Sequence, residues 1–268
     1  MTVTDELVPA NGTRLHVSRC GRGPALLLVP GAGGDAGQYE QLASRLAGNC
    51  TVISYDRRAN SRSPRPADER PTSIEEQADD AVALLEVLQL APAVIFGNSL
   101  GALIALSCAL RAPSVVSRLV VHEPVLMGVL EDPDAAMAAV QPVIGAGMAA
   151  GGLRGGAEAF FRFADSAAFA CLPQATRERM LDNAGVLFES EFGVFASWRP
   201  DPADVEALTV PVTVLVGADS RAPAFREAAS WLARHTQTPV LMAPGGHLGF
   251  AEQPDAFAEV LRRPLGRG

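Results

Sequence analysis

The sequence predicts an α/β protein, with a mostly parallel β-sheet flanked by helices and a helical insertion late in the chain. Short apolar, β-prone runs alternate with longer amphipathic stretches, a pattern typical of a parallel sheet covered by helices. The alternation stops between Glu123 and about Val210, where helical patterns follow one another without a convincing strand. A chain of 268 residues is long enough for one large domain carrying such an insertion.

Individual elements follow from local patterns. Parallel strands covered on both faces read as continuous apolar runs, as Ala25–Val29 and Val212–Val216 do. The predicted strands are Thr13–Ser18, Ala25–Val29, Thr51–Ser54, Ala93–Phe96, Arg118–His122, Val212–Val216 and Val240–Met242. The predicted helices between them are Gly37–Ala47, Ser73–Leu88, Ser99–Arg111, Ala224–His235 and Pro254–Arg262. Ser73 with Glu76 fits a capping box.

The stretch without strands predicts a helical cap, residues 124–210, inserted after the strand that ends at His122. The core is then formed by residues 1–123 and 211–268. Helical patterns cover Ala135–Ala150, Ala157–Asp165 and Gln174–Trp198. The glycines between Gly151 and Gly156 would allow the cap to move, and they fit an ordinary loop equally well.

Composition excludes several function classes. The 22 basic residues are all arginine, and 30 acidic residues bring the formal charge to −8. Without lysine the chain cannot form a Schiff base or a Walker-type phosphate loop. An acidic chain lacks the basic stripe that nucleic acids require, so no nucleic-acid partner is expected.

The four cysteines have neither close pairs nor partnering histidines, so no metal site and no disulfide framework are expected. Acidic Asp5 and Glu6 stand where a signal peptide would be basic, and apolar runs such as Val120–Met127 are too short to span a bilayer. We therefore expect a cytoplasmic protein without a membrane partner.

A nucleophile elbow is indicated at Gly97–Gly101, where Gly-Asn-Ser-Leu-Gly separates a predicted strand from an apolar helix. This is G-x-S-x-G in the strand–turn–helix context that the motif requires. Both glycines are needed because a sharp turn packs neighbouring backbone too closely for side chains. Ser99 is the candidate nucleophile, and a serine that only caps the helix is the alternative.

An oxyanion hole is predicted beside that serine. A tetrahedral intermediate needs two N–H donors, and we assign them to Leu100, directly after the nucleophile, and Ala32. Ala32 lies in the small-residue loop Pro30–Gly34 that follows a predicted strand. The alternative for this loop is a flexible turn that binds nothing.

The base has to be one of four histidines, and His247 is favoured. It lies in a loop between the last predicted strand and the last helix, and loops at the carboxyl ends of parallel strands carry the chemistry of α/β sheets. His16 falls in an N-terminal strand pattern, His122 ends a strand and His235 ends a helix.

Together these motifs resemble the α/β-hydrolases nearly end to end, in the order oxyanion loop, Ser99, cap and His247. Tyr55–Ser63 also resembles the loop that follows an early strand in that family. Pro30 stands where the family usually has a histidine. A serine at the elbow argues against epoxide hydrolases and haloalkane dehalogenases, which carry aspartate there.

The resemblance leaves two candidates for the acid. Most members carry it three residues beyond a glycine after the strand that follows the cap, which here is Ser220, so Asp219 is one residue early. Other members, such as zearalenone-lactonase-like enzymes, use a glutamate after the strand that precedes the cap, which here is Glu123. We favour Glu123, because a carboxylate at the end of an apolar strand is costly to bury without a partner.

Other side chains are weaker candidates. Arg57 and Arg58 could bind a carboxylate, but a structural pair with Asp56 is favoured. In the predicted cap, the large side chains that could line a substrate pocket are Met127, Phe188, Phe192, Phe195 and Trp198. Aromatic residues at helical spacing usually pack a core.

These features predict a cofactor-independent serine hydrolase that acts on a neutral, mostly apolar small-molecule ester or lactone through an acyl-enzyme. The alternatives are a carbon–carbon bond hydrolase of ring-cleavage products, a thioesterase or cyclase of a biosynthetic pathway, and a triad-bearing ligand receptor. The sequence leaves a homodimer open.

Overall fold

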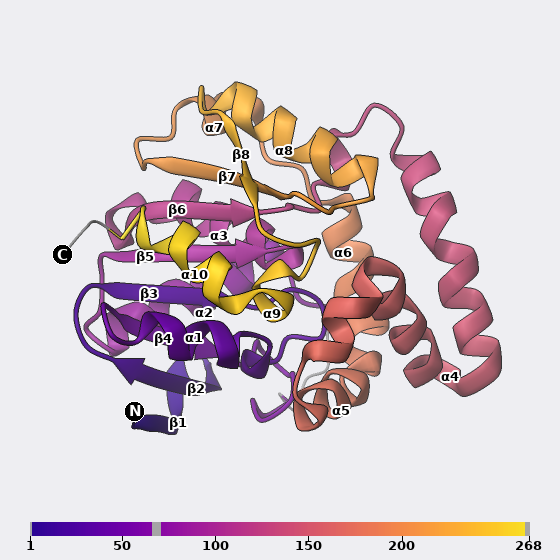
Figure 1. The fold of residues 1–268 in the computed structure, drawn as a ribbon, viewed down its shortest axis with the longest axis horizontal. Helices are drawn as coiled ribbons and strands as arrows, with labels where there is room; N and C mark the ends of the chain where they lie inside the picture. The colour runs from indigo at the N-terminus through magenta and orange to yellow at the C-terminus, as the bar shows by residue number, and fades with distance from the viewer. Residues whose placement is uncertain (1, 66–70, 266–268) are drawn as a thin grey trace.

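The computed structural model describes residues 2–65 and 71–265, and over these ranges it contains one sheet of eight strands, ordered β1-β2-β4-β3-β5-β6-β7-β8 (Figure 1). The strands are β1 (Val3–Ala10), β2 (Thr13–Gly21), β3 (Ala25–Val29), β4 (Thr51–Tyr55), β5 (Ala93–Asn98), β6 (Val116–His122), β7 (Val212–Gly217) and β8 (Val240–Ala243). β3 to β8 are parallel, whereas β2 is antiparallel to both β1 and β4. The predicted fold class is confirmed.

All seven predicted strands are present, and β1 is the one that the sequence analysis missed. Its first five residues are exposed, so it lacks the apolar run used to find the others. It forms a hairpin with β2 through Asn11 and Gly12, at φ 43° and 74°. Asn-Gly is a strong hairpin signal because both residues accept positive φ, and that signal would have located β1.

Helices cover both faces of the sheet. One face is covered by α2 (Ile74–Val87), α3 (Leu100–Arg111) and α8 (Pro223–His235). The other is covered by α1 (Glu40–Leu46), α9 (Gly249–Glu252) and α10 (Pro254–Arg262). Successive side chains of β3 alternate between these two cores, with Leu27 in the first and Leu28 in the second.

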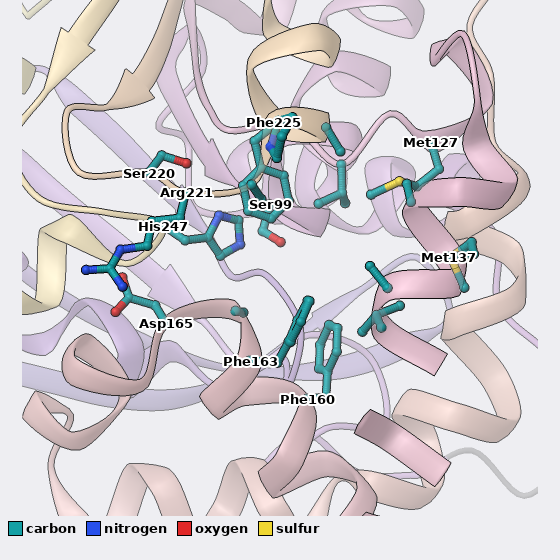
Figure 2. A pocket seen from close by; sticks show the side chains of 18 of the residues that line it. Ser99, Met127, Met137, Phe160, Phe163, Asp165, Ser220, Arg221, Phe225 and His247 are labelled. Atoms are coloured by element: carbon teal, nitrogen blue, oxygen red, sulfur yellow. The ribbon is translucent and has the colours of Figure 1, made fainter. Parts of the chain in front are cut away.

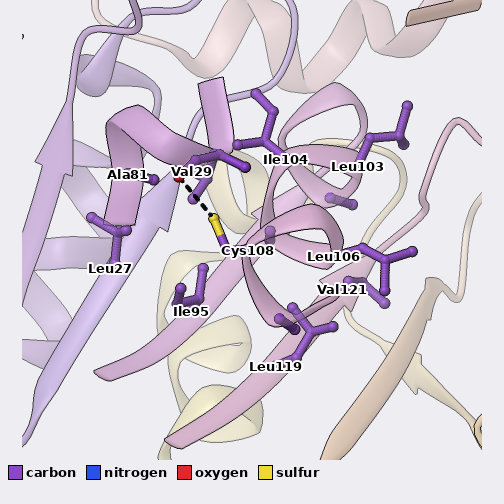
Figure 3. Packing of buried hydrophobic residues seen from close by; sticks show 14 of the residues in the cluster. Leu27, Val29, Ala81, Ile95, Leu103, Ile104, Leu106, Cys108, Leu119 and Val121 are labelled. Atoms are coloured by element: carbon purple, nitrogen blue, oxygen red, sulfur yellow. Dashed lines mark hydrogen bonds between the residues drawn. The ribbon is translucent and has the colours of Figure 1, made fainter. Parts of the chain in front are cut away.

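Helix α3 is the central helix of the first core. Every residue from Leu100 to Ala109 is buried, so the helix is apolar all round, as a fully enclosed helix must be. Figure 3 shows Leu106 beside Val121 of β6 and Cys108 facing α2, where its thiol donates a 3.5 Å hydrogen bond to the carbonyl of Ala78. This packing fixes the helix whose first turn follows Ser99.

The insertion after β6 is helical. It contains η3 (Met127–Val129), α4 (Pro133–Cys171), α5 (Gln174–Asp182), the π-helical turn η4 (Val186–Glu191), α6 (Phe192–Ser197) and α7 (Pro202–Glu206). In Figure 1, α4, α5 and α6 lie beyond the carboxyl ends of the strands. The single helix expected over Gln174–Trp198 is instead α5, η4 and α6.

Helix α4 is not one straight helix. Gly151, Gly152 and Asp165 have non-helical backbone angles that divide it. In the described part of the chain it is the one helix that is long and apolar enough to cross a membrane by length and composition, and most of its apolar stretch is not buried in the protein. Its later part packs on the core through Phe161 and Phe169.

Candidate active site

The turn between β5 and α3 holds Ser99 in a strained conformation, φ 56° and ψ −124°, which non-glycine residues rarely adopt. A Cβ atom on Gly97 would lie 2.2 Å from the carbonyl oxygen of Gly101, and one on Gly101 would lie 2.1 Å from that of Val29. Neither position accepts a side chain, which confirms the predicted need for both glycines.

His247, in the loop between β8 and α9, contacts a carboxylate from β6. Its Nδ1 lies 2.7 Å from Oε2 of Glu123, the residue after β6. Glu123 is fully buried, and its Oε1 accepts a 2.9 Å hydrogen bond from the backbone N–H of Gly217. The ring of Phe225 stacks on the imidazole at 4.2 Å between centroids. The carboxylate at Nδ1 and the stacked phenyl ring together fix the orientation of the imidazole.

The charge of Glu123 follows from these contacts. Burial alone raises its pKa, but the hydrogen bond from His247 and the neighbouring imidazoles lower the pKa to about 2. The carboxylate is therefore ionised at neutral pH and accepts the Nδ1 proton. That tautomer leaves Nε2 of His247 as a hydrogen-bond acceptor.

Asp219, the other candidate acid, lines the same cavity as His247, but the hydrogen bond to the imidazole Nδ1 comes from Glu123. Asp219 is exposed, and its backbone N–H donates to the carbonyl of Gly245. The carboxylate on His247 is that of Glu123. The family position three residues beyond Gly217 carries Ser220, as the sequence shows.

Glu123 itself sits at φ 46°, another left-handed conformation that side chains disfavour. Its backbone N–H continues the pairing with β7 by donating to Leu215, 3.0 Å away. The strained turn therefore places the carboxylate at the edge of the sheet without breaking the ladder. Backbone strain of this kind accumulates at functional sites.

Asn98 links the three segments that meet here, a role the sequence analysis did not assign. Its side-chain N–H group lies 2.9 Å from the carbonyl of His247, 3.3 Å from that of His122 and 3.0 Å from Nδ1 of His122. His122 is fully buried against Phe257, and burial lowers its pKa to about 4. It is neutral at physiological pH.

The loop after β3 lies directly on the elbow. A Cβ atom on Gly31 would be 3.2 Å from Cβ of Ser99 and 3.1 Å from the carbonyl oxygen of Asn98. The absent side chain is what allows this approach. Ala32, half-buried, follows Gly31, and Leu100 opens α3 beyond the serine. The two predicted N–H donors therefore belong to the loop that contacts Ser99 and to the residue directly after Ser99.

Three arginines of the loop after β4, Arg57, Arg58 and Arg62, are paired within the protein. Arg57 contacts Glu191, Arg58 contacts Asp80, and Arg62 contacts Asp56. The expected Asp56–Arg pair is present, but its arginine is Arg62, which donates two hydrogen bonds to Asp56, and not Arg57 or Arg58. The side chain of Arg57 instead forms an ion pair with the buried carboxylate of Glu191, in the cap.

A cavity of about 1220 Å³ lies between the core and the cap, and Ser99, Leu100 and His247 line it. Figure 2 shows the Ser99 hydroxyl and the His247 ring side by side within it, with Met127 and Met137 on one wall. The apolar lining also includes Val125, Leu130, Val140, Phe160, Phe192 and Phe195. The volume suits a small-molecule ligand.

Two of the suggested lining residues lie outside the cavity. The half-buried indole of Trp198 donates a 2.8 Å hydrogen bond to Glu75 on α2, so this side chain ties the end of α6 to the core. Phe188 packs against Phe192, with ring centroids 5.9 Å apart. Met127, Phe192 and Phe195 do line the cavity.

The polar end of the cavity lies beside His247, where Figure 2 shows Arg221 and Asp165. Asp165 accepts hydrogen bonds from the backbone N–H groups of Leu248 and Ala168, each 3.1 Å long. It therefore connects the cap to the loop that carries His247. In the part of the chain that the structure describes, no three His, Cys, Asp or Glu side chains are arranged to hold a metal ion.

Comparison with known proteins agrees with this architecture. A family model described as "Alpha/beta hydrolase family" matches residues 26–260. The chain is 38% identical over 130 residues to "Uncharacterized hydrolase YraK" of Bacillus subtilis (strain 168), and this match covers 48% of each protein. The chain thus spans about half the length of that curated relative.

Solved structures share the fold over almost the whole chain. The enol-lactonase from Burkholderia xenovorans LB400 has a TM-score of 0.76 and 19% identity, over 97% of this chain and 99% of its own. A thermophilic esterase from Thermogutta terrifontis has a TM-score of 0.76 and 22% identity, over 99% and 98%. At these identities the similarity shows the fold alone.

The buried His122 predicts a pH dependence of stability. Its folded pKa of about 4 lies below the ordinary 6.5, so its contribution is complete above pH 6.5 and is lost as the pH falls through 4. As the pH falls from 7 to 4.5, the loss of this contribution should lower the free energy of unfolding by roughly 2–3 kcal/mol. Urea unfolding of wild type and His122→Asn should differ in pH dependence by that amount.

The surface variant His235→Asn is the matched control, because the side chain of His235 lies at the end of α8 beside Glu206. Of these two variants, only His122→Asn removes a fully buried imidazole. If His122→Asn had the same pH dependence of stability as the wild type, the lowered pKa of His122 would be contradicted.

Proposed function

The chain belongs to the alpha/beta hydrolase family, and on that basis we propose that it is a serine hydrolase that cleaves a neutral, mostly apolar ester or lactone through an acyl-enzyme on Ser99. The observation that carries the proposal is the 2.7 Å contact between Nδ1 of His247 and the buried carboxylate of Glu123. His247 lines the same cavity as Ser99, the strained serine at a strand–helix turn.

In the proposed reaction Oγ of Ser99 attacks the acyl carbon while Nε2 of His247 accepts the hydroxyl proton. The backbone N–H groups of Ala32 and Leu100 stabilise the oxyanion. The imidazolium then protonates the leaving group, which departs. A water molecule, deprotonated by the same imidazole, cleaves the acyl-enzyme and restores Ser99.

Glu123 supports this cycle in two ways. Its ionised carboxylate holds His247 in the tautomer that presents Nε2 to the serine, and it stabilises the imidazolium when the proton arrives. Because its pKa is about 2, the carboxylate does not take up that proton. Burial strengthens the interaction by excluding water.

The cavity supports a neutral substrate. Its lining includes two arginines, Arg162 and Arg221, against six carboxylates: Glu131, Asp132, Asp165, Asp219, Glu227 and Glu252. A surplus of negative charge opposes the entry of anions, which disfavours the carboxylate-bearing dienoates that a carbon–carbon bond hydrolase would bind. An esterase and a lactonase among the proteins of similar fold agree with an ester or lactone substrate.

Replacement of Ser99 tests the nucleophile. Ser99→Ala should lower the hydrolysis of p-nitrophenyl butyrate by at least about 10³-fold, because the acyl-enzyme can no longer form, and should leave the circular dichroism spectrum unchanged. Ser166→Ala is the control, since Ser166 is an exposed serine that lines the same cavity. Absence of hydrolysis by the wild type would contradict the proposal and would favour a ligand receptor.

The two acid candidates make opposite predictions. Glu123→Gln should reduce kcat by about 10²–10⁴-fold, because the amide cannot stabilise the imidazolium. Asp219→Asn, at an exposed position that does not contact His247, should stay within about twofold of wild type. The reverse ranking in steady-state kinetics would transfer the role to Asp219.

The apolar wall predicts a preference for longer acyl chains. The value of kcat/KM should rise by about tenfold from p-nitrophenyl acetate to the hexanoate, as methylene groups worth up to ~0.8 kcal/mol each become partly buried. Met127→Ala should weaken this preference, whereas Trp198→Phe, outside the cavity, should keep it. A preference for succinyl over butyryl esters would rule out a neutral substrate.

A further inference from the structure

Arg57 is fully buried beneath the oxyanion loop and uses both terminal nitrogens of its guanidinium. Nη1 donates to Oε1 of Glu191 at 2.6 Å and to Oε1 of Gln77 at 2.7 Å. Nη2 donates to Oε2 of Glu191 at 2.8 Å and to the backbone carbonyl of Gly31 at 3.0 Å. Four N–H groups therefore bind three segments: the cap, α2 and the loop after β3.

Stability alone does not account for this pair. Both charged side chains are 0% exposed, and the desolvation of two buried charges offsets most of their attraction, so that apolar residues of similar volume often serve as well. A function that needs a directed N–H donor at this point would explain why an arginine occupies it.

The donor is directed at one peptide group. The carbonyl oxygen of Gly31 accepts from Arg57 and from the backbone N–H of Gly34, 3.1 Å away. In a planar trans peptide the carbonyl and the following N–H point in opposite directions. Fixing the Gly31 carbonyl toward Arg57 therefore turns the N–H of Ala32 away from it, on a loop that is in contact with Ser99.

We propose that Arg57 is a positioning residue for the oxyanion hole: through the Gly31 carbonyl it fixes the direction of the Ala32 N–H. Glu191, from the cap, holds Arg57 in place as its counter-ion. This inference rests on the proposed function, because it assigns the Ala32 N–H to the oxyanion.

The cap is thereby part of the catalytic geometry. Glu191 ends η4, a π-helical turn, and such turns are frequent at functional sites. Phe195 on α6 lines the cavity and lies 5.6 Å from the guanidinium carbon, so it separates the ion pair from the ligand. The arginine acts through the peptide group without touching the substrate.

Two variants remove the directed donor by different routes. Arg57→Met with Glu191→Met replaces the whole ion pair by apolar side chains and avoids an unpaired buried charge. Arg57→Lys keeps a cation for Glu191, but its single ammonium does not reproduce the planar fork that reaches the Gly31 carbonyl. Gln77→Leu is the matched control: it removes a buried partner of Arg57 and leaves the contact with Gly31 intact.

With p-nitrophenyl butyrate, both Arg57 variants should lose about 10²-fold in kcat, the effect of one oxyanion donor, with KM within about threefold of wild type. Gln77→Leu should retain kcat within about threefold. Circular dichroism and thermal unfolding identify the variants that are folded, and the comparison is made among those.

A trifluoromethyl alkyl ketone provides a second readout. Oγ of Ser99 adds to its carbonyl carbon, the proton passes to His247, and the oxygen becomes the oxyanion of a hemiketal. Its inhibition constant should rise by the same factor as kcat falls, because the adduct resembles the transition state. A merely structural role would change stability and KM without this parallel.

Folded Arg57 variants with wild-type kcat and wild-type ketone affinity would overturn the inference, as would an equal loss in Gln77→Leu. The proposed function would survive those results, since it depends on the contrast between wild type and Ser99→Ala. If the wild type neither hydrolyses the ester nor binds the ketone, the proposed function fails and the inference fails with it.

Discussion

The burial of one carboxylate, that of Glu123, is the constraint around which the site is arranged. A fully buried charge has to be met by donors, and here the backbone N–H of Gly217 and the imidazole of His247 supply them. Those partners come from the ends of two further strands, β7 and β8. The carboxylate thus joins β6, β7 and the loop after β8 at a single point.

The parallel topology brings the other segments of the site close to Glu123. β3, β5, β6 and β8 all end at the same edge of the sheet, and they are followed by the Gly31 loop, Ser99, Glu123 and the His247 loop, respectively. Close backbone packing at the glycines and hydrogen bonds from Asn98 hold these segments together. The strand ends thus set the positions of Ser99, Glu123 and His247, whereas the cap contacts the Gly31 loop through Arg57 and Glu191.

Sequence patterns predicted those features that are determined by residues close together in the chain. The apolar runs identified seven strands, and the elbow motif gave the Gly97–Gly101 turn with its steric reason. β1 was missed because its exposed residues carry no apolar run. The pairing of Arg57 with Glu191 joins residues 134 positions apart, and local patterns carry no information about such a contact. For the same reason Trp198 was expected in the cavity, although its partner Glu75 lies 123 positions away on α2.

The hydrogen bonds of Asp165 have a mechanical consequence for the passage of ligands. One oxygen of this carboxylate caps the last segment of α4, and the other accepts a hydrogen bond from the N–H of Leu248, the residue after His247. Hinging the cap outward at this break pulls on the peptide directly after His247. Any outward movement of the cap at this break that admitted a ligand would therefore also displace the loop that carries His247.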